Sequence, residues 1–228
     1  MTARARWKEL CMDTTGGETL GRFWAGALGL EFRADGGPGD VVGEVEGQGI
    51  AMCEVPEEKT VKHRVHIDVK AASISDLEAL GASVVLPAEE SGFRWTVMVD
   101  PEGGEFCAFH REPDELPAYR FYELIVDSAE PEAIARWWAD VFGTDVQHDD
   151  QEGSWFWIEG VPGLPFEGIV FVPVPEPKAV KNRIHWDVYA NVGDMEAAGA
   201  TLLRAKGDEI GWHVMADPEG NEFCVFDN

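Results

Sequence analysis

The strongest constraint on the fold is an internal duplication. The segment WTVMVDPEGGEFCAF at residues 95–109 matches WHVMADPEGNEFCVF at residues 212–226 almost residue for residue. Earlier in each copy, VKHRVHIDV at residues 61–69 matches VKNRIHWDV at residues 180–188. Because the matching pieces keep one order, the chain must contain two equivalent copies of the same fold.

The duplication divides the 228 residues into two halves. We predict a first domain at residues 1–112 and a second at residues 121–228. Residues 113–120 contain two prolines and several charged side chains, a composition typical of a linker. Two equivalent copies in one chain can satisfy internally the contact that two separate copies would make as a dimer. A monomer is therefore slightly favoured over a homodimer.

Each half divides again into two units with the same order of elements. RWKELCMD at residues 6–13 alternates like a strand, and residues 20–28 carry apolar side chains at helical spacing, ended by Gly29. Short strand-like segments separated by glycines complete the unit. HRVHIDVK at residues 63–70 starts the next unit, with a short helix at residues 74–80 and further strands. The sequence therefore predicts an α+β fold with four βαβββ modules.

Charge and cysteine spacing exclude several classes of protein. The formal net charge is -25, from 43 acidic and 18 basic residues. Such a polyanion is repelled by nucleic acid and by anionic membrane surfaces, so neither is an expected partner. No apolar run approaches a membrane span, the N-terminus lacks a signal-peptide pattern, and the four cysteines form no CxxC pair. We expect a cytoplasmic protein with reduced thiols.

The motifs, taken in this order, resemble the vicinal oxygen chelate superfamily. The nearest subgroup is the glyoxalase-like and bleomycin-resistance-like proteins with two tandem domains. FWAGALGLEF at residues 23–32, PEEKTVKHRVHIDV at 56–69 and DPEGGEFCAF at 100–109 carry the likeness, each with a counterpart in the second half. The resemblance implies that the modules form two glyoxalase-like domains with curved mixed sheets around a cavity. It does not give the chemistry, because the superfamily includes lyases, isomerases, dioxygenases and drug-binding proteins.

The resemblance also implies candidate metal ligands. In metal-using members, the ligands come from the first strand of each module and from the last strand of the second module. Glutamates two residues before the last-strand position lie on the same strand face. The corresponding residues here are Glu9, Glu123, His66, His185, Cys107, Cys224, Glu105 and Glu222.

The match to that ligand set is partial. The expected last-strand Glu is a Cys in both halves, and the expected first-strand His is a Glu. Two hypotheses stay open: a divalent metal ion in at least one half, or no metal. Without a metal, His66 and His185 are hydrogen-bonded cavity or core residues held by Asp68, Asp187 or a neighbouring strand. Cys107 then packs as a small hydrophobic side chain, as does Cys224.

Two arginines recur at equivalent places and share strand faces with the histidines. Alternation places Arg64 on the face of His66, and Arg183 on that of His185. They form either internal salt bridges that position the strand or bidentate clamps on a substrate oxyanion. His213, which replaces Thr96 of the first half, is a further candidate ligand-binding residue.

Aromatic residues give the clearest indication of a ligand. Helical spacing places two of the nine tryptophans, Trp24 and Trp138, in the helix-to-sheet core. Trp7, which alternation places on the face of Glu9, is either core or cavity lining. Four more tryptophans are likewise either core or cavity lining. A cavity lined by them would favour flat, apolar or cationic molecules. They are Trp95, Trp155, Trp157 and Trp212.

These observations predict a small-molecule-binding protein of the glyoxalase/bleomycin-resistance type. It would bind an aromatic or amphipathic metabolite or drug in a Trp-lined cavity, without a cofactor. The alternatives are a metal-dependent lyase, isomerase or dioxygenase of the same superfamily, or a metal-free isomerase or cyclase on the same fold. The second half, richer in aromatic residues, is the favoured location of the site.

Overall fold

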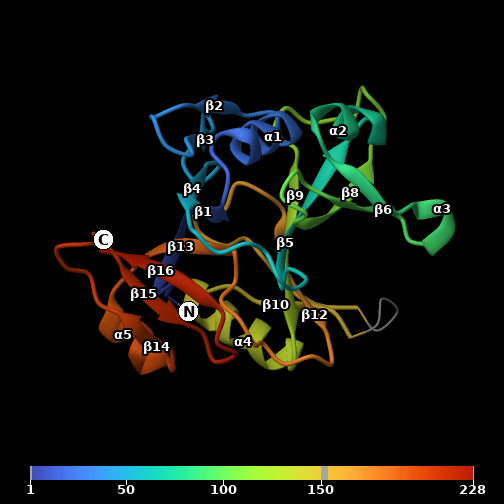
Figure 1. The fold of residues 1–228 in the computed structure, drawn as a ribbon. Coiled ribbons are helices and arrows are strands. Elements are labelled where there is room, and N and C mark those ends of the chain that lie inside the picture. Colours follow the sequence, from blue (N-terminus) through green and yellow to red (C-terminus); the bar gives the residue numbers. More distant parts are fainter. Residues whose placement is uncertain (1, 150–153, 228) are drawn as a thin grey trace.

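The computed structural model describes residues 2–149 and 154–227 (Figure 1). In this part of the chain, four units follow one another. The first contains β1 (Ala5–Thr14), α1 (Thr19–Leu28), β2 (Glu31–Arg33), β3 (Asp40–Val42) and β4 (Ile50–Glu54). The second contains β5 (Val65–Ala71), α2 (Ile74–Leu80), β6 (Ser83–Leu86), α3 (Ala88–Ser91), β7 (Thr96–Val99) and β8 (Glu105–His110). The short helix α3 is an addition to the predicted pattern.

The second half repeats this order. The third unit contains β9 (Phe121–Ser128), α4 (Pro131–Phe142), β10 (Val146–His148), β11 (Phe156–Glu159) and β12 (Gly168–Pro173). The fourth contains β13 (Ile184–Ala190), α5 (Val192–Ala198), β14 (Thr201–Arg204), β15 (His213–Ala216) and β16 (Glu222–Phe226). The α+β fold with four βαβββ modules is confirmed.

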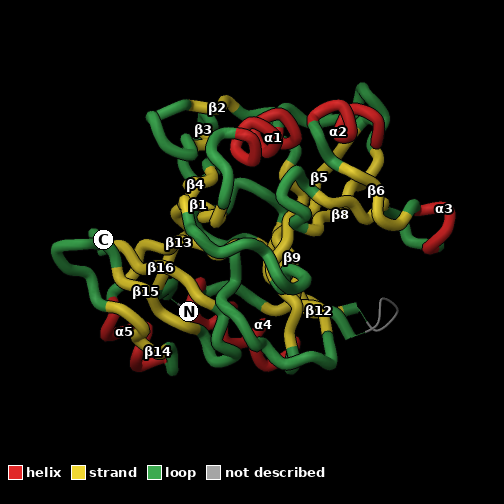
Figure 2. The backbone as a smooth tube through the Cα atoms, in the orientation of Figure 1, coloured by secondary structure: helices red, strands yellow, loops and turns green. Residues whose placement is uncertain are grey.

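The described strands form two curved, mixed, eight-stranded sheets, and each sheet joins units from opposite halves of the chain (Figure 2). One sheet has the order β14-β15-β16-β13-β1-β4-β3-β2 and so combines the first and fourth units. The other has the order β10-β11-β12-β9-β5-β8-β7-β6 and combines the second and third units. The joins are antiparallel, between β1 and β13 and between β5 and β9.

Helix packing holds the two units of each half together. Trp24 on α1 contacts Phe106 of β8 in an edge-to-face arrangement, with ring centroids 5.4 Å apart. Trp138 on α4 makes the equivalent contact with Phe223 of β16 at 5.1 Å. Trp24 is 1% exposed and Trp138 is 0% exposed, which confirms both as core residues. Each half is thus held by its core, while each sheet is shared between halves, and the division at residues 112 and 121 stays a prediction.

Local sequence explains where the helices end and one strand bends. Gly29 ends α1 and Gly143 ends α4, both in the left-handed conformation that glycine adopts without strain. The ladder between β1 and β13 shifts between Trp7 and Glu9. This bulge turns Trp7 into the core, where it is 1% exposed and donates from Nε1 to the carbonyl of Gly47. The prediction that Trp7 shares the face of Glu9 is therefore wrong.

Two buried histidine, aspartate and cysteine clusters as candidate functional sites

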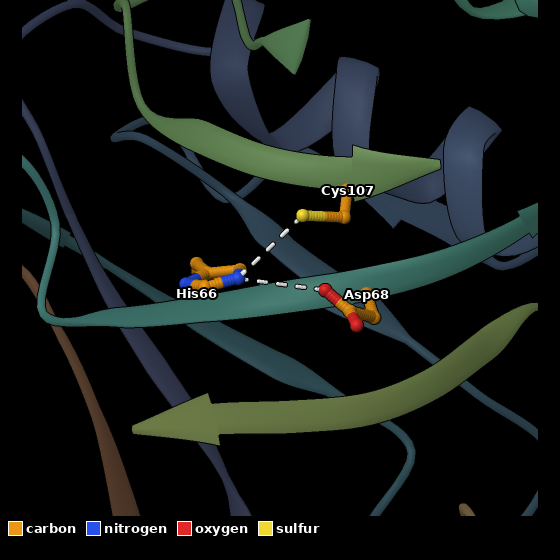
Figure 3. A group of neighbouring side chains, drawn as sticks. All are labelled: His66, Asp68 and Cys107. Carbon is orange, nitrogen blue, oxygen red and sulfur yellow. Dashed lines mark hydrogen bonds and ion pairs between the residues drawn. The ribbon is translucent and has the colours of Figure 1, made fainter. Parts of the chain in front are cut away.

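The first cluster lies on the sheet that contains β5 and β8. His66 and Asp68 are two residues apart on β5, so their side chains lie on the same face, and Cys107 of β8 is directly opposite Asp68. His66 Nε2 lies 3.5 Å from Asp68 Oδ1 and 3.7 Å from Cys107 Sγ (Figure 3). We call this side of the sheet the His66 face.

The second cluster repeats this geometry on the other sheet. His185 and Asp187 alternate along β13, and Cys224 of β16 is directly opposite Asp187. In each cluster, the imidazole nitrogen, carboxylate oxygen and sulfur that could serve as ligands all lie within 4.8 Å of one another. We call this side of the second sheet the His185 face. The duplication has therefore preserved a three-residue arrangement, not only a fold.

Burial governs the electrostatics of both clusters. It lowers the pKa of His66 and of His185 to about 3, because a charged imidazole loses its hydration there. Burial also raises the pKa of Asp187 to about 6, opposed by the charge of Lys8, whose Nζ lies 3.6 Å from Asp187. The pKa of Asp68 is raised well above its usual range by burial and by the charge of Glu123. At neutral pH both imidazoles are therefore uncharged.

Both cysteine thiols are protonated for the same reason. Burial raises the pKa of Cys107 and of Cys224 well above the ordinary range, and the neighbouring Asp68 and Asp187 charges raise it further. Such thiols are weak nucleophiles by themselves. Any covalent role would need a cation or base to draw off the proton.

Several buried polar atoms in the clusters have no hydrogen-bond partner within residues 2–149 and 154–227. These atoms are Nδ1 of His66, Nδ1 of His185, Oδ1 of Asp187 and Oδ1 of Asp68, which has only the 3.5 Å contact with His66 Nε2. An unsatisfied buried polar group costs roughly 1–3 kcal/mol. The same cost appears in both copies, which is the pattern expected of groups kept for a ligand rather than for stability.

Comparison with known proteins shows the family. The family model described as "Glyoxalase-like domain" matches residues 9–109 and again residues 123–226. The chain belongs to the glyoxalase-like domain family. No curated protein matches it in sequence.

Solved structures agree with this glyoxalase-like assignment at the level of the fold. Glyoxalase I from Zea mays superposes with a TM-score of 0.69 at 11% identity, covering 98% of this chain and 92% of that one. A putative dioxygenase from Bacillus subtilis superposes with a TM-score of 0.63 at 14% identity, covering 100% of this chain and 86% of that one. At such identities the likeness concerns the fold alone.

The structure of this glyoxalase-like protein places the predicted glutamates outside the clusters. Glu105 accepts hydrogen bonds from Lys59 Nζ at 2.9 Å and from the backbone N–H of His63 at 3.0 Å. Its counterpart Glu222 accepts from Lys178 Nζ at 2.7 Å and from the backbone N–H of Asn182. These carboxylates fix the loops that enter β5 and β13.

The two first-strand glutamates lie next to the clusters. Glu9 is opposite Asp187 in the ladder and forms an ion pair with Lys8. Glu123 is opposite Asp68. The acidic members of the clusters themselves, Asp68 and Asp187, were considered in the sequence only as partners that hold the histidines. The signal that identifies them is the H-x-D spacing, which puts imidazole and carboxylate on one strand face in both halves.

The arginines predicted to bind ligand contact backbone carbonyls. Arg64 donates to the carbonyls of Glu176 at 2.7 Å and of Asp127 at 2.9 Å. Arg183 makes the matching bonds to Glu57 at 2.6 Å and to Asp13 at 3.2 Å. Each guanidinium thus ties the start of one strand to a loop from the opposite half.

A cavity of about 980 Å³ lies between the loop that precedes β5 and the loop that precedes β13, not over the clusters. Its walls are residues 55–65 and much of residues 174–183, with Asp13 and Asp127, and both arginines line it. Neither His66 nor His185 is among the lining residues. Figure 1 shows the loop between β4 and β5 near the centre of the molecule, and the loop between β12 and β13 lines the same cavity.

Aromatic side chains gather on the His66 face. Phe109 follows Cys107 by two residues on β8 and stacks on Trp95, with ring centroids 5.4 Å apart. Trp95 lies 6.0 Å from Trp155, a residue of the other half, and Phe109 lies 5.0 Å from Tyr122. All four rings are neither fully buried nor fully exposed. Two of the predicted tryptophans therefore meet beside the first cluster.

The remaining predicted residues make other contacts. Trp157 is opposite Val170, on the His66 face, and donates to Glu159 Oε1 at 2.8 Å. Trp212 stacks on Phe226 of β16 at 5.6 Å, beside the second cluster. His213 Nδ1 accepts from the backbone N–H of Lys206 at 3.4 Å.

No helix in the described ranges is long and apolar enough to span a membrane.

Proposed function

We propose that this glyoxalase-like protein binds a flat aromatic or amphipathic small molecule on the His66 face. One observation supports this most strongly: four half-buried aromatic rings and a desolvated polar cluster occupy the same side of one sheet. The register connects them, since Phe109 and Cys107 share a face of β8 and Cys107 is opposite Asp68. Stacking on the rings and hydrogen bonding to the unpartnered cluster atoms would then act together.

The character of the rings favours an apolar or cationic ligand. The Lys70 ammonium lies 4.7 Å from the Tyr122 ring centroid, and the Arg111 guanidinium 5.3 Å from it, so this ring already stacks with cations. Trp95 and Trp155 come from opposite halves of the chain. A ligand held between them would contact both halves. We therefore extend the predicted site from the second half to the sheet that the two halves share.

Tryptophan fluorescence tests this proposal with a matched control. Titration with a panel of flat aromatic and amphipathic molecules is expected to quench the wild-type emission at saturable concentration. Trp95→Phe and Trp155→Phe should each weaken binding about 10-fold, equivalent to about 1.4 kcal/mol for loss of a stacking contact. Trp212→Phe, the repeat-equivalent change on the other sheet, should leave the affinity unchanged. Equal effects of Trp95→Phe and Trp212→Phe would contradict the proposal.

The second candidate function is metal-dependent chemistry, favoured by the two triads with ligand atoms within 4.8 Å. The donors fit: an uncharged imidazole, a carboxylate and a thiol suit a borderline ion such as Zn²⁺, and the unpartnered cluster atoms would gain a partner. His66, Asp68 and Cys107 would hold the ion in one sheet. A divalent ion there supplies Lewis-acid polarisation of substrate oxygens.

Elemental analysis of the purified protein tests the metal candidate. The expected result is bound divalent metal that chelators remove and that His66→Ala and His185→Ala reduce. Ligand quenching that persists in metal-free protein would support the binding function alone. Absence of metal after growth in zinc-supplemented medium and reconstitution would remove this candidate.

We further propose that the protein acts as a cytoplasmic monomer. The joins that complete both sheets, β1 with β13 and β5 with β9, are made within one chain. Sedimentation equilibrium over a wide concentration range should give the mass of a single 25.1 kDa chain. A concentration-independent dimer would contradict this.

A further inference from the structure

Two cysteine sulfurs are in contact on the His185 face. Cys11 Sγ lies 2.8 Å from Cys53 Sγ, and the two residues come from the adjacent parallel strands β1 and β4. Cys11 is opposite Ala51 in this ladder, and Cys53 follows Ala51 by two residues, so both side chains project from the same face. Cys11 is also directly opposite His185 in the ladder with β13, which places the sulfur pair beside the second cluster.

The other sheet carries aliphatic side chains at the equivalent positions. Ile125 is directly opposite His66, so it takes the place of Cys11. In the parallel ladder between β9 and β12, Val172 takes the place of Cys53. Both copies share the histidine, aspartate and cysteine triad, whereas the sulfur pair belongs to one copy alone. The pair therefore adds something to the His185 face that the His66 face does not have.

The two sulfurs are placed to form a disulfide bond. The bonded distance between two sulfurs is about 2.05 Å, and these two already lie 2.8 Å apart on neighbouring strands. All four cysteines of the chain lie in the described ranges and are free thiols. Among these four, Cys11 and Cys53 are the pair whose sulfurs make contact. Loss of the two thiol hydrogens and a small closing movement of the side chains would join them.

We propose that Cys11 and Cys53 form a reversible oxidation site, in which a hydroperoxide joins the two sulfurs as a disulfide. Cys53 is half-buried and Cys11 is buried, so the peroxide reaches Cys53 first. The Cys53 sulfur, as its thiolate, attacks one peroxide oxygen. The O–O bond breaks, and the other oxygen takes up a proton and leaves as water or an alcohol. Cys53 is then a sulfenic acid.

Cys11 completes the reaction as the resolving thiol. Its sulfur attacks the Cys53 sulfur, the S–O bond breaks, and the hydroxyl group leaves as water with the proton of the Cys11 thiol. The two thiols lose two electrons and two protons, and hydrogen peroxide is reduced to two molecules of water. A thiol reductant reverses the reaction by thiol–disulfide exchange. In a reducing compartment such a disulfide is transient, which is typical of redox-sensing proteins.

The disulfide would change one of the two clusters. Because Cys11 is directly opposite His185, a covalent link from β1 to β4 alters the surroundings of that imidazole. His66 is opposite Ile125 and keeps its surroundings. Oxidation would thus put the His185 face in a different state while the His66 face stays as it is. The proposal does not depend on small-molecule binding at the His66 face.

Peptide mapping of the full chain tests the proposal. The protein is reduced with dithiothreitol, freed of the reductant and treated with a small excess of hydrogen peroxide in the presence of a chelator. Remaining thiols are then alkylated in denaturant. The expected result is that two of the four cysteines escape alkylation, that a peptide cross-linked between Cys11 and Cys53 appears, and that dithiothreitol restores all four thiols.

Nuclear magnetic resonance of ¹⁵N-histidine-labelled protein provides the second measurement. Oxidation should shift the ring nitrogens of His185 and leave those of His66 in place. The double variant Cys11→Ile, Cys53→Val copies the other sheet and so keeps apolar strand residues. Peroxide should leave both of its remaining cysteines open to alkylation and its His185 signals unmoved. Far-ultraviolet circular dichroism confirms that the variant is folded.

The wild-type protein alone can overturn the proposal. Four alkylated cysteines after peroxide treatment would do so, as would a cross-link that joins Cys107 or Cys224 instead. Oxidation of Cys53 to a sulfinic acid without a cross-link would also contradict it, and so would equal shifts at His66 and His185. The variant Cys107→Ala, on the other sheet, should still form the cross-link. The fluorescence titration of Trp95 and Trp155 reports separately on the small-molecule site, so either proposal can fail without the other.

Discussion

Asp187 lies directly opposite Cys224 in the parallel ladder between β13 and β16, two residues beyond His185 on the same strand face. Asp68 and Cys107 repeat this relationship on the other sheet. Pairing in the ladder and alternation along a strand therefore suffice to assemble imidazole, carboxylate and sulfur. The arrangement places an acidic group where burial opposes its ionisation, and this has a measurable consequence for stability.

The first prediction concerns Asp187→Asn and pH. Burial raises the pKa of Asp187 in the folded protein to about 6, against about 3.9 in an unfolded chain. Between these values the folded state binds more protons, so this carboxyl is least costly below pH 4 and destabilises increasingly as pH rises through 6. The full difference is on the order of 3 kcal/mol. Asp187→Asn removes this destabilisation. The free energy of unfolding of the variant should therefore rise relative to that of the wild type between pH 4 and 7.

Urea unfolding at several pH values checks this first prediction. The exposed substitution Asp208→Asn is the control and should show no comparable pH-dependent gain. Parallel stability curves for wild type and Asp187→Asn would show that the carboxyl does not change its pKa on folding.

The second prediction concerns the core contact between the units of each half. Trp138 is fully buried and donates from Nε1 to Asp217 Oδ2 at 3.2 Å. Trp138→Ala should lower the free energy of unfolding by about 3–5 kcal/mol, because it leaves a large cavity and removes one hydrogen bond from the buried Asp217 carboxylate. Trp212→Ala, which truncates a half-buried ring, should cost clearly less in the same urea titration. Equal costs would contradict the assignment of Trp138 to the core.

The third prediction separates backbone strain from close packing at helix ends. A Cβ at Gly29 would lie 2.2 Å from the carbonyl oxygen of Ala118, and φ there is +72°. Gly92 has a similar φ of +74° but no atom within 4 Å of the Cβ position. Gly92→Ala should therefore cost only the left-handed strain, about 1–2 kcal/mol. Gly29→Ala should cost more in thermal or urea unfolding, since it also displaces the segment before β9. Equal losses of stability in Gly29→Ala and Gly92→Ala would mean that the segment before β9 moves aside without an energetic cost.

Sequence reasoning succeeded where periodicity and glycine chemistry decide the structure. The duplication predicted four units, and spacing placed Trp24 and Trp138 in the core. Gly29 ends α1 in the left-handed conformation, as the pattern indicated. These features depend on residues within one element, which a sequence displays directly.

Features that depend on distant partners were not predictable in the same way. The repeat shows which units are alike but not which pair, because the joins of β1 with β13 and β5 with β9 bring residues of opposite halves together. Alternation gave the wrong face for Trp7, since a bulge interrupts the strand. It also placed Glu105 near the cluster, whereas the carboxylate extends to Lys59 on a loop.

The contact between Cys11 Sγ and Cys53 Sγ, which lie 2.8 Å apart, illustrates the same limit. Cys11 and Cys53 are 42 residues apart, and only the parallel pairing of β1 with β4 makes them neighbours. The four cysteines looked unrelated because no CxxC spacing joins them. A comparison of the two halves at Cys11 and Ile125 would have shown the asymmetry, but not its place beside His185.

Nuclear magnetic resonance of the histidine side chains, in protein labelled with ¹⁵N-histidine, tests the central claim most directly. His66 and His185 should stay uncharged from pH 7 down to pH 5, in accord with pKa values of about 3, and their ring nitrogens should shift when Zn²⁺ or a quenching ligand is added. Imidazoles at these two positions that titrate near pH 6.5 and ignore both additions would contradict the existence of desolvated, ligand-ready clusters.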